Sequence, residues 1–366
     1  MRRRSGLLGA AVGLAAATAG AALVADRKVS AARRAGHATR HDYDPPAADR
    51  VGTVMTPDGV ALYYEENGPS DASVTVVAAH GFCLDRDDFL FQRRAVIEVY
   101  GTQVRFVSYD HRSHGRSGRG TAATATIDQL GADLGLVLDE LVPTGRVVVI
   151  GHSMGGMTIM ALAEQRPELF QADGRVAGVV LLSTSTGRLA EVTLGLPAVF
   201  ARGGVVLPVV MKGMQRQKGI VEKGRSEAGD ILWVFIKRAA FGRHVEPGLV
   251  EFVAQLIAAT PVDVIAEFYP ALISHDKLVA LGNLRHTSVA VVCGDRDLIT
   301  PPSHSATMAE ALPNAELVTI PDTGHQALME RPELVNAPLL RLIDQALTRA
   351  VVSVPRQRRR RRLSES

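Results

Sequence analysis

Gly151-His152-Ser153-Met154-Gly155 matches the pattern G-x-S-x-G. A chain with 34 glycines can match this pattern by chance, so the neighbouring residues matter. An apolar, β-branched run (147–150) precedes the pentapeptide, and a helical pattern (157–165) follows it. In this strand–turn–helix setting a catalytic serine lies in a sharp, strained turn, with small residues two positions before and after it. The sequence therefore predicts that Ser153 is a nucleophile.

Short apolar runs alternate with longer amphipathic stretches on both sides of this turn. Helical patterns such as 127–141 separate the runs, and 60–64 after the turn signal Asp58-Gly59 is typical of the second arm of an antiparallel hairpin. The alternation predicts an open α/β fold with a mostly parallel sheet and helices on both faces. Such sheets bind ligands at the carboxyl ends of their strands. The predicted strands are 75–79, 104–108, 147–150, 179–182, 288–292 and 315–320.

The alternation stops between residues 184 and 285, where the apolar clusters have helical spacing. An insertion of this length is typical of a cap and not of a loop. We expect this insertion to form a helical lid before the penultimate strand. Its stretch 192–211 is apolar, which suits either contact with a hydrophobic acyl chain or simple packing of the lid onto the body.

A nucleophilic serine needs a base to take its proton, and the base needs a carboxylate to orient it. Of the eleven histidines, His325 lies directly after the last predicted strand. Gly294-Asp295-Arg296-Asp297 follows the strand before it. We expect His325 to be the base and Asp297 the acid, with Asp295 as the alternative acid.

The oxyanion of a tetrahedral intermediate needs two fixed hydrogen-bond donors. The backbone N–H of Met154 lies at the start of the helix after Ser153, where the helix dipole also favours negative charge. His80-Gly81-Phe82 follows the strand at 75–79 and offers the N–H of Phe82. We expect Phe82 and Met154 to form the oxyanion hole.

Five motifs occur in one order along the chain, and together they resemble the α/β-hydrolase superfamily in its capped esterase, lipase and cofactor-free haloperoxidase-like branch. The resemblance covers about residues 51–350. It implies an eight-stranded sheet, Asp297 as the acid in the G-x-x-D pattern of the triad Ser153, Asp297, His325, and a lid at about 187–284. Ser113 is a departure, because many relatives have glycine there, in a loop that is structural in the family. The motifs are His80-Gly81-Phe82, Asp110-His111-Arg112-Ser113-His114-Gly115-Arg116-Ser117, Gly151-His152-Ser153-Met154-Gly155, Gly294-Asp295-Arg296-Asp297 and Gly324-His325.

Because the predicted nucleophile is a serine, fewer of the reactions known in this superfamily are expected here. Haloalkane dehalogenases and epoxide hydrolases of the superfamily carry an aspartate at the position of Ser153, so acyl transfer to water is expected instead. We predict a lipase-like carboxylesterase that acts on a small hydrophobic ester. Haloperoxidases or perhydrolases and carbon–carbon bond hydrolases use the same triad and stay open. A non-catalytic ligand-binding protein on the same fold is the alternative outside enzymes.

No cofactor is expected, and no metal, because the histidines are scattered and no H-E-x-x-H motif is present. The two cysteines, Cys83 and Cys293, are expected to be free thiols.

The net charge of +3 is unevenly distributed. Residues 1–40 carry +7 and residues 356–366 carry +5, so the stretch between them carries −9. The body is therefore acidic and has no basic face with interleaved aromatic residues, which argues against a nucleic-acid partner. Residues 355–366 are expected to be a disordered basic tail.

The N-terminus has the pattern of a targeting or anchoring segment. Arg2-Arg3-Arg4 precede an uncharged run (5–25) that is rich in Ala, Gly, Leu and Val. The run is long enough to cross a bilayer as a helix, although Ala19-Gly20-Ala21 could serve as a cleavage site and the paired arginines allow an export signal. We expect residues 1–40 to be a signal-like or membrane-anchor segment with a basic linker. This segment would place the protein at the cell membrane or envelope, or secrete it after cleavage.

Overall fold

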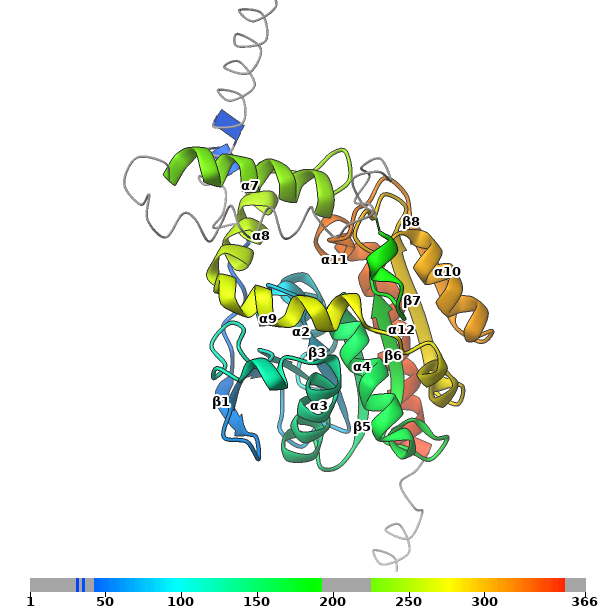
Figure 1. The fold of residues 1–366 in the computed structure, drawn as a ribbon. Coiled ribbons are helices and arrows are strands. Elements are labelled where there is room, and N and C mark those ends of the chain that lie inside the picture. The colour runs from blue at the N-terminus through cyan, green and yellow to red at the C-terminus, as the bar shows by residue number, and fades with distance from the viewer. Residues whose placement is uncertain (1–30, 33–34, 37–42, 193–224, 353–366) are drawn as a thin grey trace, which may run out of the picture.

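One eight-stranded sheet forms the centre of the computed structural model, which describes residues 31–32, 35–36, 43–192 and 225–352 (Figure 1). Its strands lie in the order β1-β2-β4-β3-β5-β6-β7-β8. The pairs β1–β2 and β2–β4 are antiparallel, and the other pairs are parallel. The strands are β1 (Arg50–Met55), β2 (Ala61–Asn67), β3 (Val74–Ala79), β4 (Val104–Tyr109), β5 (Arg146–His152), β6 (Val176–Leu182), β7 (Ser288–Gly294) and β8 (Glu316–Ile320).

The predicted α/β-hydrolase fold is confirmed. Every predicted apolar run coincides with a strand, although the run 315–320 and the hairpin arm 60–64 each begin one residue before β8 and β2. A helix boundary differs more. The helix expected from residue 157 begins at Met154, because α4 (Met154–Gln165) starts directly after Ser153.

Helices cover both faces of the sheet because successive side chains of a strand point to opposite sides. Val76 and Val148 point to the face covered by α2 (Leu90–Tyr100) and α12 (Pro332–Val352). Their neighbours Val77 and Val149 pack on the other side. That second face is covered by α3 (Ile127–Leu141), α4 and α10 (Pro302–Ala311), and Figure 1 shows α3 and α4 in front of the sheet.

The start of α4 crosses close to the end of β3. A Cβ added at Gly155 would lie 1.8 Å from the carbonyl oxygen of Ala79, the last residue of β3. A Cβ at Gly151 would lie 2.5 Å from the carbonyl carbon of Gly155. Both glycines are therefore required by backbone contact, as the sequence predicts.

The loop after β4 explains the departure at Ser113. Ser113 has a φ of 66°, in the left-handed region that favours glycine. Its hydroxyl accepts a hydrogen bond from the N–H of Gly120 at 3.0 Å, which fixes the loop. Nearby, the buried guanidinium of Arg112 is paired with Asp133 and Asp58.

The segment between β6 and β7 is helical where the structure describes it. It contains α7 (Arg225–Ala240), α8 (Pro247–Ala259) and α9 (Val262–Ile273), with short 3-10 turns η5 (Leu189–Glu191) and η7 (Val279–Leu284) at its ends. Residues 193–224, which include nearly all of the predicted apolar stretch 192–211, lie outside the described residues. The role of 187–284 as a lid stays a prediction.

The helix α9 lies across the start of α4 (Figure 1). Phe268 and Val264 of α9 share a buried apolar cluster with Met154 and Met157 of α4, and Phe82 packs against this cluster. The inserted helices therefore contact the chain at the carboxyl ends of β3 and β5.

A buried carboxylate joins the insertion to the loop after β8. Glu330, at the end of the short helix α11 (Ala327–Glu330), accepts hydrogen bonds from the N–H of Gly242 at 2.8 Å and of Gly324 at 2.7 Å. The N–H of Gln326 donates to the carbonyl of Ala240, the last residue of α7, at 2.8 Å. Burial raises the pKa of Glu330 to about 7, although the two N–H groups oppose that shift.

The predicted tails lie almost wholly outside the described residues, which include only 31–32 and 35–36 of the first forty. Within the described ranges, no single helix has the length and hydropathy to cross a membrane, and α8 with α9, bent by 94°, meets that test only as a pair. The apolar run 5–25 lies outside the described residues, so the membrane anchor stays a prediction. Cys83 and Cys293 are both buried and free, as expected.

We expect Gly155→Ala to destabilise the fold by about 3 kcal/mol, because the added methyl group must displace the Ala79 carbonyl or the start of α4. The matched control is Gly282→Ala in the exposed turn η7, where a Cβ meets no atom within 4 Å and the change should stay within about 0.5 kcal/mol. Urea unfolding of both variants measures the difference. Equal stability of the two variants would show that α4 does not need this close approach.

We expect Glu330 to make the stability of the protein pH-dependent. Because its pKa is raised from 4.5 to about 7 in the folded chain, its contribution is fully present below pH 4.5 and is lost as the pH rises to about 7. Relative to Glu330→Gln, the parent should lose up to about 3 kcal/mol across this window. Urea midpoints from pH 4.5 to 8 test this, with exposed Glu333→Gln as control. Parallel pH curves for the parent and Glu330→Gln would contradict it.

Candidate functional site

The residues predicted to carry chemistry follow the carboxyl ends of four parallel strands. Phe82 follows β3, Ser153 follows β5, Asp297 follows β7 and His325 follows β8. Because these strands are neighbours in the order β3-β5-β6-β7-β8, their ends form one edge of the sheet. The topology therefore places the predicted residues at the edge where open α/β sheets bind ligands.

Ser153 has the backbone of a strained turn. Its φ of 51° and ψ of −115° lie outside the regions that a serine ordinarily adopts. The N–H of Ser153 donates to the carbonyl of Leu182 at 3.0 Å, and its own carbonyl accepts from the Thr184 hydroxyl at 2.6 Å. The neighbouring strand β6 and the residues after it thus hold the turn, and Ser153 as a residue is buried, with 9% of its surface exposed.

His325 and Asp297 form a buried hydrogen-bonded pair. The Nδ1 atom of His325 lies 2.8 Å from Oδ2 of Asp297. The Thr300 hydroxyl donates to the same oxygen, and the N–H groups of Ile299 and Thr300 donate to Oδ1, all at 2.8 Å. A carboxylate can only accept, so Nδ1 of His325 carries the proton and Nε2 is left to accept one.

These donors decide the charge of Asp297. Burial alone would raise the pKa of its carboxyl, but the His325 ring and the Thr300 donors outweigh burial and lower the pKa below the ordinary value. The alternative acid, Asp295, is exposed; it accepts a long bond of 3.4 Å from the N–H of Thr323 and lies 3.8 Å from Nε of Arg296. The structure therefore pairs His325 with Asp297.

His325 contacts His152, the residue that precedes Ser153 in the sequence. The two rings have centroids 4.9 Å apart, and Nε2 of His152 lies 3.2 Å from the carbonyl oxygen of His325. A direct bond between Ser153 Oγ and His325 is not among the hydrogen bonds of the described residues. In free enzymes such bonds are often long and tighten when substrate binds.

The predicted oxyanion donors have unused N–H groups. Neither Phe82 nor Met154 donates a backbone hydrogen bond within the part of the chain that the structure describes. Met154 is the first residue of α4, where the N–H groups have no partner inside the helix. An unpaired N–H directly after the strained serine, and a second one on the loop after β3, are donors of the kind that an oxyanion requires.

The loop that carries Phe82 is held by a neutral histidine. The Nε2 atom of His80 accepts the N–H of His111 at 2.9 Å, and its Nδ1 donates to the carbonyl of Gly81 at 2.8 Å. Burial lowers the pKa of His80 to about 4, which agrees with an uncharged ring. His111 and His114 are also buried beside it, with ring centroids 4.4 and 5.5 Å from His80.

Sequence reasoning did not find several polar residues that support this site. His152 and Asp88 form a second buried pair, with Nδ1 of His152 2.7 Å from Oδ2 of Asp88. Thr184 and Thr300 fix the backbone of Ser153 and the carboxylate of Asp297. The sequence could have indicated a role for His152, because its titratable side chain ends a strand whose residues between Arg146 and His152 carry no polar side chain.

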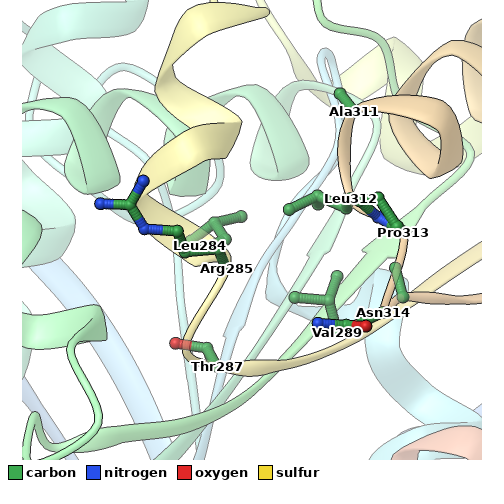
Figure 2. A pocket seen from close by; sticks show the side chains of 9 residues that line it. Leu284, Arg285, Thr287, Val289, Ala311, Leu312, Pro313 and Asn314 are labelled. Atoms are coloured by element: carbon green, nitrogen blue, oxygen red, sulfur yellow. The ribbon is translucent and has the colours of Figure 1, made fainter.

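Two cavities lie away from these residues. One of about 40 Å³ is lined by Val289, Leu284 and Leu312 among others, as Figure 2 shows. Val289 is near the amino end of β7, opposite to the end that carries Asp297. A second, of about 430 Å³, is lined mainly by polar side chains, including Asp139 and Arg166. Neither contacts the predicted triad, and no group of three His, Cys, Asp or Glu side chains in the described ranges could hold a metal ion.

Comparison with known proteins agrees with this architecture. The chain is 25% identical over 263 residues to an sn-1-specific diacylglycerol lipase of Mus musculus, covering 70% of this chain and 77% of that protein. It is 34% identical over 134 residues to a non-heme chloroperoxidase of Streptomyces lividans, covering 36% and 44%. An esterase structure from Exiguobacterium antarcticum shares the fold, with a TM-score of 0.64 and 17% identity over 80% of this chain and 99% of the esterase. The profile of the alpha/beta hydrolase family matches residues 76–337, so the protein belongs to this family.

Proposed function

We propose that the protein is a serine hydrolase that cleaves carboxylic esters through an acyl-enzyme intermediate. One observation carries the proposal: a strained Ser153 at the end of β5 follows His152, whose ring lies 4.9 Å from that of His325 in the buried Asp297–His325 pair. Membership of a family that contains hydrolases supports the reaction class.

In the proposed reaction, Ser153 attacks the acyl carbonyl while Nε2 of His325 takes the hydroxyl proton. The charge on the resulting imidazolium is stabilised by Asp297, whose carboxylate stays ionised because four donors surround it. His325 then gives its proton to the leaving alcohol. The same ring activates a water molecule, which releases the acid from Ser153.

The tetrahedral oxyanion would lie against the N–H groups of Phe82 and Met154. The side chains of these two residues pack with Phe268 and Ile265 of α9, so the donors lie in apolar surroundings. Hydrogen bonds to an oxyanion are stronger where water is excluded.

A hydrophobic ester is the substrate class that this setting favours. The apolar contacts of α9 with Phe82 and α4 support it. So does the similarity to a mouse protein described as a diacylglycerol lipase. Residues 5–25, as a membrane anchor, would bring the enzyme to lipidic esters, and this location is part of the proposal.

Peroxide-dependent chemistry is the second candidate. The similarity to a non-heme chloroperoxidase favours it, because peroxide can replace water in attacking the same acyl-enzyme. Peracid formation in the presence of hydrogen peroxide and a short carboxylic acid distinguishes the two activities.

We expect the full-length chain to hydrolyse p-nitrophenyl esters of two to sixteen acyl carbons, with a preference that defines the acyl-binding site. Ser153→Ala should lower kcat at least about 10³-fold, because no other group can form the acyl-enzyme. Exposed Ser303→Ala is the matched control and should keep full activity. An inactive parent whose Ser153 is not labelled by a fluorophosphonate would rule out the hydrolase and favour a binding protein.

We expect Asp297→Asn to lower kcat about 10³- to 10⁴-fold with little change in KM, because the amide no longer fixes the His325 tautomer or stabilises the imidazolium. Asp295→Asn removes a carboxylate two residues away and should change kcat less than about twofold. Steady-state kinetics on the best ester compares the two variants. A larger loss for Asp295→Asn would assign the acid to the other carboxylate.

A further inference from the structure

The ring of His152 lies between two oxygen atoms that can only accept hydrogen bonds. Its Nδ1 is 2.7 Å from a carboxylate oxygen of Asp88, and its Nε2 is 3.2 Å from the backbone carbonyl oxygen of His325. The side chains of both His152 and Asp88 are fully buried. Each ring nitrogen therefore needs a proton to form its contact.

His80, which follows β3 on the same edge of the sheet, shows the opposite arrangement. Its Nε2 faces a donor, the N–H of His111, and its Nδ1 faces an acceptor, so a neutral ring satisfies both. A neutral His152 would place one nitrogen lone pair against an oxygen lone pair in a buried place. Such an unsatisfied polar contact is costly, and an imidazolium avoids it.

The charges around His152 are compatible with a cation. Asp88 on η2 (Arg86–Phe89) is in direct contact, Asp297 after β7 is a second negative group, and His80 after β3 and His325 after β8 are the titratable rings beside it. Burial opposes the charge on His152, but the negative charge and hydrogen bond of Asp88 outweigh it, and the pKa of His152 is raised. The pair carries no net charge, which makes its burial tolerable.

We propose that Asp88 and His152 form a lasting carboxylate–imidazolium pair that positions the base His325 by donating a hydrogen bond to its backbone carbonyl. The inference rests on the proposed hydrolase function, and His152 acts as a positioning residue that does not touch substrate. The Asp88 oxygen that accepts from His152 also accepts the N–H of Gly81 at 3.1 Å. One buried carboxylate thus joins the loop of the base to the loop of the oxyanion donor Phe82.

The protonation state of the His152 ring is measured first, by NMR of the full-length chain with ¹⁵N-labelled histidine. We expect both ring nitrogens of His152 to carry protons at pH 7 and at pH 8, with the signals identified by their loss in His152→Gln. An unprotonated ring nitrogen at pH 7 would overturn the inference, because the pair would then be neutral. This measurement needs no substrate and no Asp88 variant.

The positioning role is tested with Asp88→Asn, which keeps the shape and an acceptor oxygen but removes the charge. His152 should then lose a proton near neutral pH and with it the bond to the His325 carbonyl. We expect kcat to fall about 10- to 100-fold with KM within about twofold, since small displacements of a catalytic group cost this much. The matched control is Asp87→Asn on the same turn, where the carboxylate makes only a 3.6 Å contact with Arg86 and kcat should not change.

The outcomes separate this inference from the proposed function. Unchanged kcat in Asp88→Asn, or an equal loss in Asp87→Asn, overturns the positioning role while Ser153-dependent hydrolysis stands. A neutral His152 ring in an active enzyme also overturns the positioning role and leaves the proposed hydrolase function standing. Absence of any Ser153-dependent turnover overturns the proposed function and the positioning role together.

Discussion

The crossing of α4 over the end of β3 at Gly155 governs the geometry around Ser153. The Ala79 carbonyl occupies the place of a side chain at Gly155, so the helix can begin directly after the serine. Ser153 is then held at a φ of 51°, a strain of about 1–3 kcal/mol that the buried contacts of β3, β5 and α4 must offset. Because α4 begins directly after Ser153, the N–H of Met154 has no acceptor inside the helix.

Around this turn, hydrogen-bond partners set the charge of three buried side chains, those of Asp297, His80 and His152. Asp297 is surrounded by donors, which keeps it ionised and fixes the proton of His325 on Nδ1. His80 faces one donor and one acceptor and is neutral, while His152 faces two acceptors. Because water cannot repair a mismatch in these places, the partners of each ring determine its charge.

The sheet and the insertion contribute differently to function. The strand ends carry the residues that we propose as acid, base and nucleophile, and the loop of one proposed oxyanion donor. The inserted helix α9 adds apolar contacts at Phe82 and Met154, and Glu330 ties the end of α7 to the loop before His325. Substrate choice is therefore expected to follow the insertion, and the reaction type to follow the strand ends.

The sequence by itself determined the strands, the turn at Ser153 and the position of His325, because these depend on local periodicity and on small residues beside the serine. It left Asp295 and Asp297 as alternatives, since both follow β7, and only the fold turned Asp297 toward His325 and left Asp295 exposed. The contact of His152 with Asp88 joins residues 64 positions apart, and Glu330 reaches Gly242 across 88 positions. Such contacts depend on how separate elements pack, which no local pattern of residues encodes.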